Sequence, residues 1–135
     1  SIYLSLHEEC MHSLGQMFDS DIDLNKSFKE RVNFAISERL TIYEEYETLF
    51  IATISNSARL PTLVNQVAES YQIMRERFIE IVPEIKNLST IKSDLLFTRI
   101  TFPPWFSLRK LLKHDQKIII DELSDDLVKY IKDTI

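Results

Sequence analysis

Glycine is nearly absent from this 135-residue chain, which contains only Gly15. A dinucleotide-binding G-x-G-x-x-G loop needs three glycines and a P-loop needs two, so neither phosphate-binding motif can occur. Tight β-hairpins are also disfavoured, because their turns depend on glycine or asparagine at positive φ. The four prolines, Pro61, Pro83, Pro103 and Pro104, leave long stretches free of proline. This composition predicts an all-helical chain.

Cysteine and long apolar runs are equally scarce. Cys10 is the only cysteine, which excludes a disulfide within the chain and a cysteine-based zinc site and favours a cytoplasmic, reducing compartment. The longest apolar runs, such as residues 49–52 and 118–120, are far shorter than the roughly 20 residues that cross a bilayer. We therefore expect no membrane partner.

Positive charge is in the minority, since 16 Lys and Arg residues face 21 Asp and Glu residues, and 16 − 21 gives a net charge of −5. This balance opposes direct binding of nucleic acid by the chain. Apolar residues make up 44% of the sequence and charged residues 27%, both ordinary values for a globular protein. The length suits one domain spanning residues 1–135.

The spacing of apolar residues predicts helices over residues 2–18, 26–57, 61–82, 88–101 and 116–133, with a short helical segment after Pro103-Pro104. A break is expected within the second helix near residues 41–47, and Ser27 followed by Glu30 fits a capping box at its start. The third helix has the most regular stripe, with spacings of four and three: Leu60, Val64, Val67, Tyr71, Met74, Phe78 and Ile81. We predict an antiparallel bundle of about five to six helices.

An acidic run between the first two helices resembles a calcium-binding loop. Asp19, Asp21, Asp23 and Glu30 occupy positions 1, 3, 5 and 12 of the D-x-[DN]-x-[DN]-G-x₅-E pattern. The four acidic positions keep a calcium-binding domain as one alternative. Position 6, which normally requires glycine, is Leu24, so we expect instead a solvated turn whose acids cap helices.

No local pattern supports catalysis. The nucleophile elbow G-x-S-x-G cannot form, and Glu8 with His12 supplies only two ligands on one helix face, which do not make a metal site. We predict that the chain is not an enzyme and that it holds neither a metal nor a cofactor.

Large aromatic side chains lie on or beside the predicted inner stripes. Most simply, they form the core. Rings and flexible methionines also surround small apolar ligands inside helical bundles, and Tyr71 and Trp105 each bring a hydrogen-bond donor that could orient such a ligand. The sequence leaves a filled core and a ligand cavity open as alternatives.

Three segments occur in a familiar order. A helix over residues 2–18 comes first. The stretch Arg39-Leu40-Thr41-Ile42-Tyr43-Glu44-Glu45-Tyr46-Glu47-Thr48-Leu49-Phe50 follows, then Ala58-Arg59-Leu60-Pro61 and a long helix. Trp105-x-x-Leu108-Arg109 precedes Asp115 and an amphipathic last helix. This order resembles the C-terminal effector-binding and dimerisation region of the tetracycline-repressor (TetR/AcrR) family of bacterial transcription regulators. The family's helix-turn-helix DNA-binding domain is expected before Ser1, so operator DNA would be a partner only through that domain.

The resemblance implies a sensor, most simply of a repressor. A small apolar or amphipathic effector would bind among the middle helices and shift the first helix, which carries Leu6, Cys10 and Leu14. The residues implied for the ligand cavity are Phe34, Tyr71, Met74, Phe78 and Trp105. The last two helices would pair with those of a second copy through Leu95, Phe102, Leu123, Leu127 and Tyr130.

The last helix independently favours a homodimer, because its apolar face is broader than a peripheral helix needs. That face comprises Ile118, Ile119, Ile120, Leu123, Leu127 and Ile131. The alternative function is a helical protein–protein interaction module without a small-molecule ligand.

Overall fold

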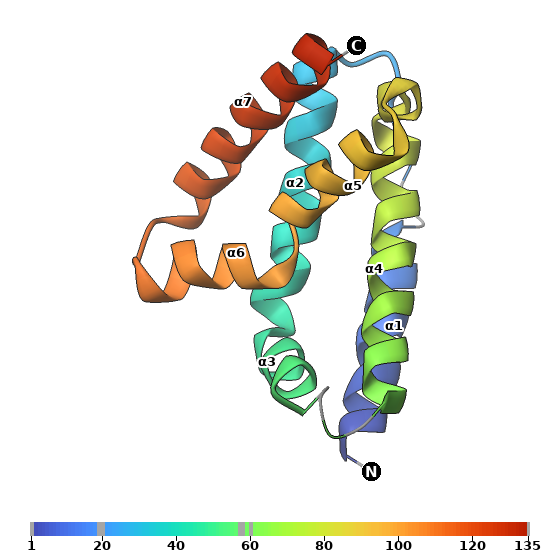
Figure 1. The fold of residues 1–135 in the computed structure, drawn as a ribbon, viewed down its shortest axis with the longest axis vertical. Helices are drawn as coiled ribbons and strands as arrows, with labels where there is room; N and C mark the ends of the chain where they lie inside the picture. Colours follow the sequence, from blue (N-terminus) through green and yellow to red (C-terminus); the bar gives the residue numbers. More distant parts are fainter. Residues whose placement is uncertain (1, 19–20, 57–58, 60, 135) are drawn as a thin grey trace.

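Helices account for the fold. The computed structural model describes residues 2–18, 21–56, 59 and 61–134, and no β-strand occurs among them. Six helices within these described ranges have ten residues or more: α1 (Ile2–Phe18), α2 (Phe28–Glu45), α3 (Glu47–Asn56), α4 (Pro61–Ile81), α5 (Thr90–Arg99) and α7 (Gln116–Thr134). Figure 1 shows their arrangement. The predicted all-α class is confirmed.

Proline marks the short elements. Pro83 ends α4 and begins a 3₁₀ turn, η1 (Pro83–Asn87). Pro103 and Pro104 stand in the first turn of α6 (Phe102–Phe106), where a missing backbone donor costs little. A π-helical turn, η2 (Ser107–Leu111), continues α6 without a gap. The segment from Phe102 to Leu111 therefore connects α5 to α7 as one helical arm.

The predicted break in the second helix lies at Tyr46, between α2 and α3. Its backbone leaves the helical range at φ −112° and ψ 29°, although its N–H still donates to the carbonyl of Ile42 at 2.9 Å. No glycine or proline is present here. The Tyr46 hydroxyl instead contacts the hydroxyl of Ser13 and the carbonyl of Glu9, both on α1. These contacts with α1 hold the Tyr46 side chain at the junction of α2 and α3.

The acidic run serves as a turn and a helix cap. The Asp23 carboxylate accepts the N–H of Asn25 at 3.0 Å, and the Ser27 hydroxyl accepts the N–H of Glu30 at 3.2 Å to cap α2. The Glu30 carboxylate in turn accepts the Ser27 hydroxyl proton at 3.0 Å. Asp19, part of the calcium pattern, lies outside the described residues. In the described part of the chain, no group of three or more His, Cys, Asp or Glu residues could hold a metal ion.

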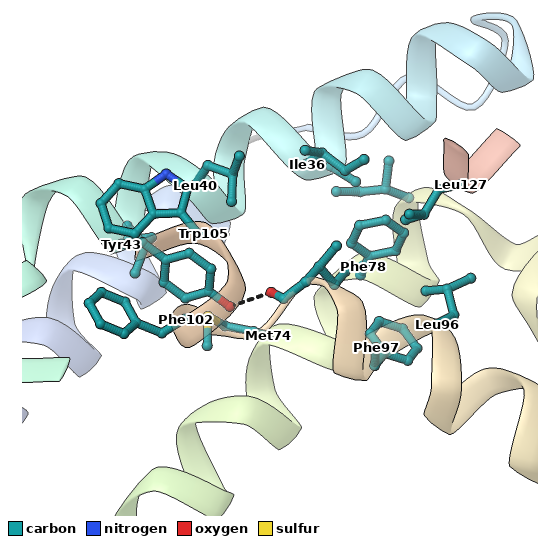
Figure 2. Packing of buried hydrophobic residues seen from close by; sticks show 14 of the residues in the cluster. Ile36, Leu40, Tyr43, Met74, Phe78, Leu96, Phe97, Phe102, Trp105 and Leu127 are labelled. Atoms are coloured by element: carbon teal, nitrogen blue, oxygen red, sulfur yellow. Dashed lines mark hydrogen bonds between the residues drawn. The ribbon is translucent and has the colours of Figure 1, made fainter. Parts of the chain in front are cut away.

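Helix α2 is the central element. It packs most extensively on α7, which runs in the opposite direction, while α4 and α1 lie on its other side (Figure 1). The core has two groups, visible in Figure 2: Tyr43, Phe102 and Trp105 gather on the left, at the C-terminal half of α2, and Phe78, Leu96, Phe97 and Leu127 gather on the right, nearer its N-terminal half. Among the described helices, none combines the length and apolar character that a membrane crossing requires.

Candidate ligand-binding site

An open pocket of about 300 Å³ lies between α2, α4 and α5. This volume is at the small end of the range for ligand pockets in proteins. Its walls are both apolar and polar, and they carry two guanidinium groups and one carboxylate. The lining residues are Arg39 from α2, Ala68, Tyr71, Gln72 and Arg75 from α4, Asp94, Phe97 and Thr98 from α5, and Thr101.

Arg39 is the unusual member of this lining, because its side chain is only 5% exposed. Its Nη1 donates to the carbonyl of Ile100 at 3.4 Å, and its Cζ lies 5.7 Å from the ring centre of Phe78 and 5.6 Å from that of Phe97. Its Nη2 atom is buried and has no hydrogen-bond partner in the described part of the chain. A buried donor without a partner is costly, so this guanidinium needs an explanation.

The other charges of the pocket are satisfied. Arg75 donates to the Asp94 carboxylate at 2.7 Å and to the Ser93 hydroxyl at 2.9 Å, and its Cζ stands 4.6 Å from the ring centre of Phe97. With Arg39, Arg75 and Asp94 in the wall, the pocket has a net charge of +1, against −5 for the whole chain.

Tyr71 adds a hydroxyl at the pocket. It accepts the backbone N–H of Phe102 at 3.2 Å. Burial raises the pKa of Tyr71 above its ordinary value, outweighing the opposing effects of that hydrogen bond and of the nearby Arg39 charge. The phenol therefore stays protonated at neutral pH and retains a proton that it can donate to a ligand.

The structure brings the five predicted cavity residues only partly together. Tyr71 lines the pocket, whereas Met74 and Phe78 are buried in the core and border a void of only about 10 Å³.

Trp105 is buried beside Tyr43 and Phe102, and its Nε1 donates to the Gln116 side chain at 2.8 Å (Figure 2). Phe34 is 44% exposed and lines surface hollows of α2 instead. Side chains thus fill the chamber that the sequence suggested around Trp105, and the open pocket lies next to it.

The five predicted dimer residues also divide into two sets. Phe102 and Leu127 are buried inside the single chain, so their side chains are occupied by its own core. Leu95 is exposed, Leu123 is half-buried, and the half-buried Tyr130 donates to the carbonyl of Lys92 at 3.0 Å. Only the second set can reach another molecule.

A separate apolar groove of about 210 Å³ runs between η2 and α7. Beside it stand three strongly exposed aliphatic side chains, with exposed fractions of 65% for Leu111, 64% for Leu112 and 54% for Ile118. Clustered exposed aliphatic residues are typical of interaction surfaces. The groove is lined by Leu108, His114, Ile118, Ile119, Glu122 and Leu123.

Helix α1 contacts α4, which borders the open pocket. Cys10 and Leu14 are buried against the body, and the Ser70 hydroxyl on α4 lies 3.7 Å from the sulfur of Met11. Ser70 directly precedes Tyr71, whose ring faces Phe50 of α3 at 6.5 Å between centres. One turn of α4 therefore touches both α1 and the pocket. The side chain of Leu6, which the sequence also assigned to the moving helix, lies outside the described residues.

Sequence reasoning missed Arg39 and the α5 wall. The signal for Arg39 was present, since the buried residues Val32, Ile36, Arg39 and Tyr43 follow one another at helical spacing. A charged residue on an otherwise apolar stripe is a candidate functional group. The α5 wall offers no comparable signal.

Comparisons of the chain with protein-family models, with curated proteins and with solved structures found no match. The likeness to the tetracycline-repressor family therefore rests on the order and spacing of residues alone.

Proposed function

We propose that this chain is the effector-sensing and dimerisation domain of a bacterial transcription regulator, most simply a repressor. A small amphipathic effector occupies the pocket between α2, α4 and α5, and its binding moves α1. The regulator's DNA-binding domain would be attached through α1 and would alone contact operator DNA. Such a regulator acts in the cytoplasm.

The observation that carries this proposal is the position of α4 between pocket and α1. Tyr71 lines the pocket, and the preceding residue, Ser70, contacts Met11 of α1. A ligand can shift an equilibrium between two states only by binding one of them better. A ligand that repositions the turn of α4 around Tyr71 would change the surface that α1 contacts. Such a ligand would therefore bind the state with a displaced α1 better than the resting state.

Dimerisation is assigned to the groove beside α7, because Ile118 lines it and is exposed, and Leu111 and Leu112, at the end of η2 nearby in the sequence, are exposed as well. A partner helix laid along this groove would remove them from water. Each fully buried aliphatic side chain contributes about 1.5–3 kcal/mol of association free energy before the costs of ordering are subtracted.

Sedimentation velocity at tens of micromolar tests this assignment. We expect the chain to sediment as a dimer and the Ile118→Asp variant as a monomer, because a carboxylate cannot be buried in an apolar interface without a partner. Val64→Asp is the matched control, since Val64 is similarly exposed but belongs to α4. A monomeric parent protein, or dissociation by both substitutions, contradicts the assigned interface.

The sensing step is tested by the reactivity of Cys10. Burial raises the pKa of this thiol from 9.0 to about 11, with a further contribution from the negative charge of Glu45, so about a hundredfold less thiolate is present than in an exposed cysteine. We expect slow modification by Ellman's reagent at pH 8. A ligand that displaces α1 exposes Cys10 and speeds the reaction.

A small panel of phenylacetate, phenylacetamide and 2-phenylethanol supplies the probes. A ligand that merely stabilises the resting arrangement slows the reaction, because it reduces opening of the fold. At least one compound should accelerate labelling several-fold. Failure of all three to accelerate labelling while one of them binds would contradict the proposed movement of α1.

A further inference from the structure

Five arginines are buried or half-buried in the described part of the chain, and four of them form an ion pair, including Arg109 with Glu44 at 3.3 Å, although the Nε of Arg109 also lacks a hydrogen-bond partner. Arg31 pairs with Glu84, Arg75 with Asp94 and Arg77 with Glu38, all at 2.9 Å or less. Arg39 is buried yet forms no ion pair in the described part of the chain, and its Nη2 has no hydrogen-bond partner there. Removing an unpaired charge from water costs several kcal/mol.

The contacts that Arg39 does make are weak substitutes for an anion. Its long hydrogen bond of 3.4 Å goes to the carbonyl of Ile100, which already accepts a short one of 2.6 Å from Tyr43. The rings of Phe78 and Phe97 add cation–π attraction, but they supply no hydrogen-bond acceptor for Nη2. Packing alone therefore does not account for a charged residue at this position.

We infer that the pocket between α2, α4 and α5 binds a small organic monocarboxylate, whose carboxylate pairs with Arg39 and accepts the hydroxyl proton of Tyr71. This inference rests on the proposed function and names the chemical class of the effector. Planar guanidinium and planar carboxylate groups match each other in geometry, and such charge-assisted hydrogen bonds are among the strongest in proteins.

The rest of the wall limits the ligand further. Phe97 and Ala68 offer an apolar surface for a short hydrocarbon or aromatic body, and the volume of about 300 Å³ suits a small ligand. Asp94 lies in the same wall and repels additional negative charge. A monoanion with an apolar body satisfies both conditions, whereas a dianion such as phosphate meets Asp94 unfavourably.

Binding includes one adjustment in the protein. The Nη2 atom of Arg39 is covered by neighbouring atoms, although Arg39 itself lines the pocket. A change of side-chain rotamer in the lining, which is common on binding, gives the carboxylate access to it. Such a change at Arg39 or Tyr71 alters the packing between α2 and α4, next to the contact with α1.

Isothermal titration of the whole chain with a matched pair of probes tests the inference. Phenylacetate and phenylacetamide have the same size and shape, and only the first is an anion. We expect phenylacetate to bind at least about tenfold more tightly, because only it forms the charge-assisted bonds. Equal affinities would overturn the carboxylate assignment and leave the sensor proposal standing. If neither compound binds, both the carboxylate assignment and the sensor proposal are contradicted.

Three variants locate the site. Arg39→Met removes the charge at similar length and should weaken phenylacetate at least about tenfold while leaving phenylacetamide unchanged. Ala68→Phe fills the pocket from an exposed position and should abolish binding of both compounds. Thr62→Phe, six residues earlier on α4 and outside the lining, is the control and should bind like the parent.

Stability separates recognition from a purely structural role of Arg39. Because its charge is unpaired, Arg39→Met should unfold at the same or a higher urea concentration than the parent. If Arg39→Met instead destabilises the fold strongly and Ala68→Phe leaves phenylacetate binding intact, Arg39 serves packing and the inference is wrong.

Discussion

Glu38→Ala is expected to lower the free energy of unfolding by about 3–5 kcal/mol, because it leaves the Arg77 guanidinium charged inside the core. The two side chains are only 7% and 4% exposed, and they meet through two parallel hydrogen bonds of 2.9 and 3.1 Å. Alanine favours helix, so a loss of helix propensity does not explain the effect. Urea unfolding followed by circular dichroism measures it.

The control is the double variant Glu38→Met/Arg77→Met. Replacing both charges by apolar side chains removes the burial cost together with the attraction, and such exchanges are often neutral or stabilising. The double variant should therefore be markedly more stable than Glu38→Ala. A loss below about 1 kcal/mol for Glu38→Ala, or equal losses for both variants, contradicts the importance of this pair.

Trp105→Ala should cost a similar amount, about 3–5 kcal/mol, through the cavity that it leaves. Trp105 is 1% exposed and contacts the rings of Tyr43 and Phe102 at 5.9 and 5.5 Å between centres. Its Nε1 hydrogen bond to Gln116 also fastens the arm that carries α6 to the start of α7. Since the substitution removes the chain's only tryptophan, circular dichroism replaces fluorescence as the readout.

Phe34→Ala is the matched control for Trp105→Ala. Both positions are aromatic and both were assigned to the cavity from the sequence, but Phe34 is 44% exposed. Its loss should stay within about 0.5 kcal/mol, as is usual for surface substitutions. Comparable losses at the two positions would mean that Trp105 is not part of a tightly packed core.

The helices could be predicted from the sequence because their signals are local. The Ser27–Glu30 cap marks the start of α2, and Pro61 and Pro83 mark the ends of α4. The regular stripe of α4 correctly predicted that Met74, Phe78 and Ile81 are buried, but it was wrong at Val64, which is 48% exposed. The break at Tyr46 was placed only approximately, since it depends on contacts with Ser13 and Glu9 of α1 rather than on glycine or proline. Tertiary contacts of that kind leave no periodic signal.

The candidate site was harder to predict for a related reason. Apolar spacing shows which face of a helix is covered, but not what covers it. Phe102 and Leu127 were assigned to a second copy, yet their own chain buries them. Tyr71 and Arg39 both line the open pocket, but the apolar spacing pointed only to Tyr71, because such a pattern is defined by its apolar members.

A crystal structure of the whole chain grown with phenylacetate tests most directly whether a small carboxylate held at Arg39 repositions α1. We predict a carboxylate oxygen within hydrogen-bonding distance of both the Arg39 guanidinium and the Tyr71 hydroxyl, together with a displacement of α1 relative to α4. A ligand bound elsewhere, or one bound at Arg39 with α1 in its present place, would contradict the sensor mechanism.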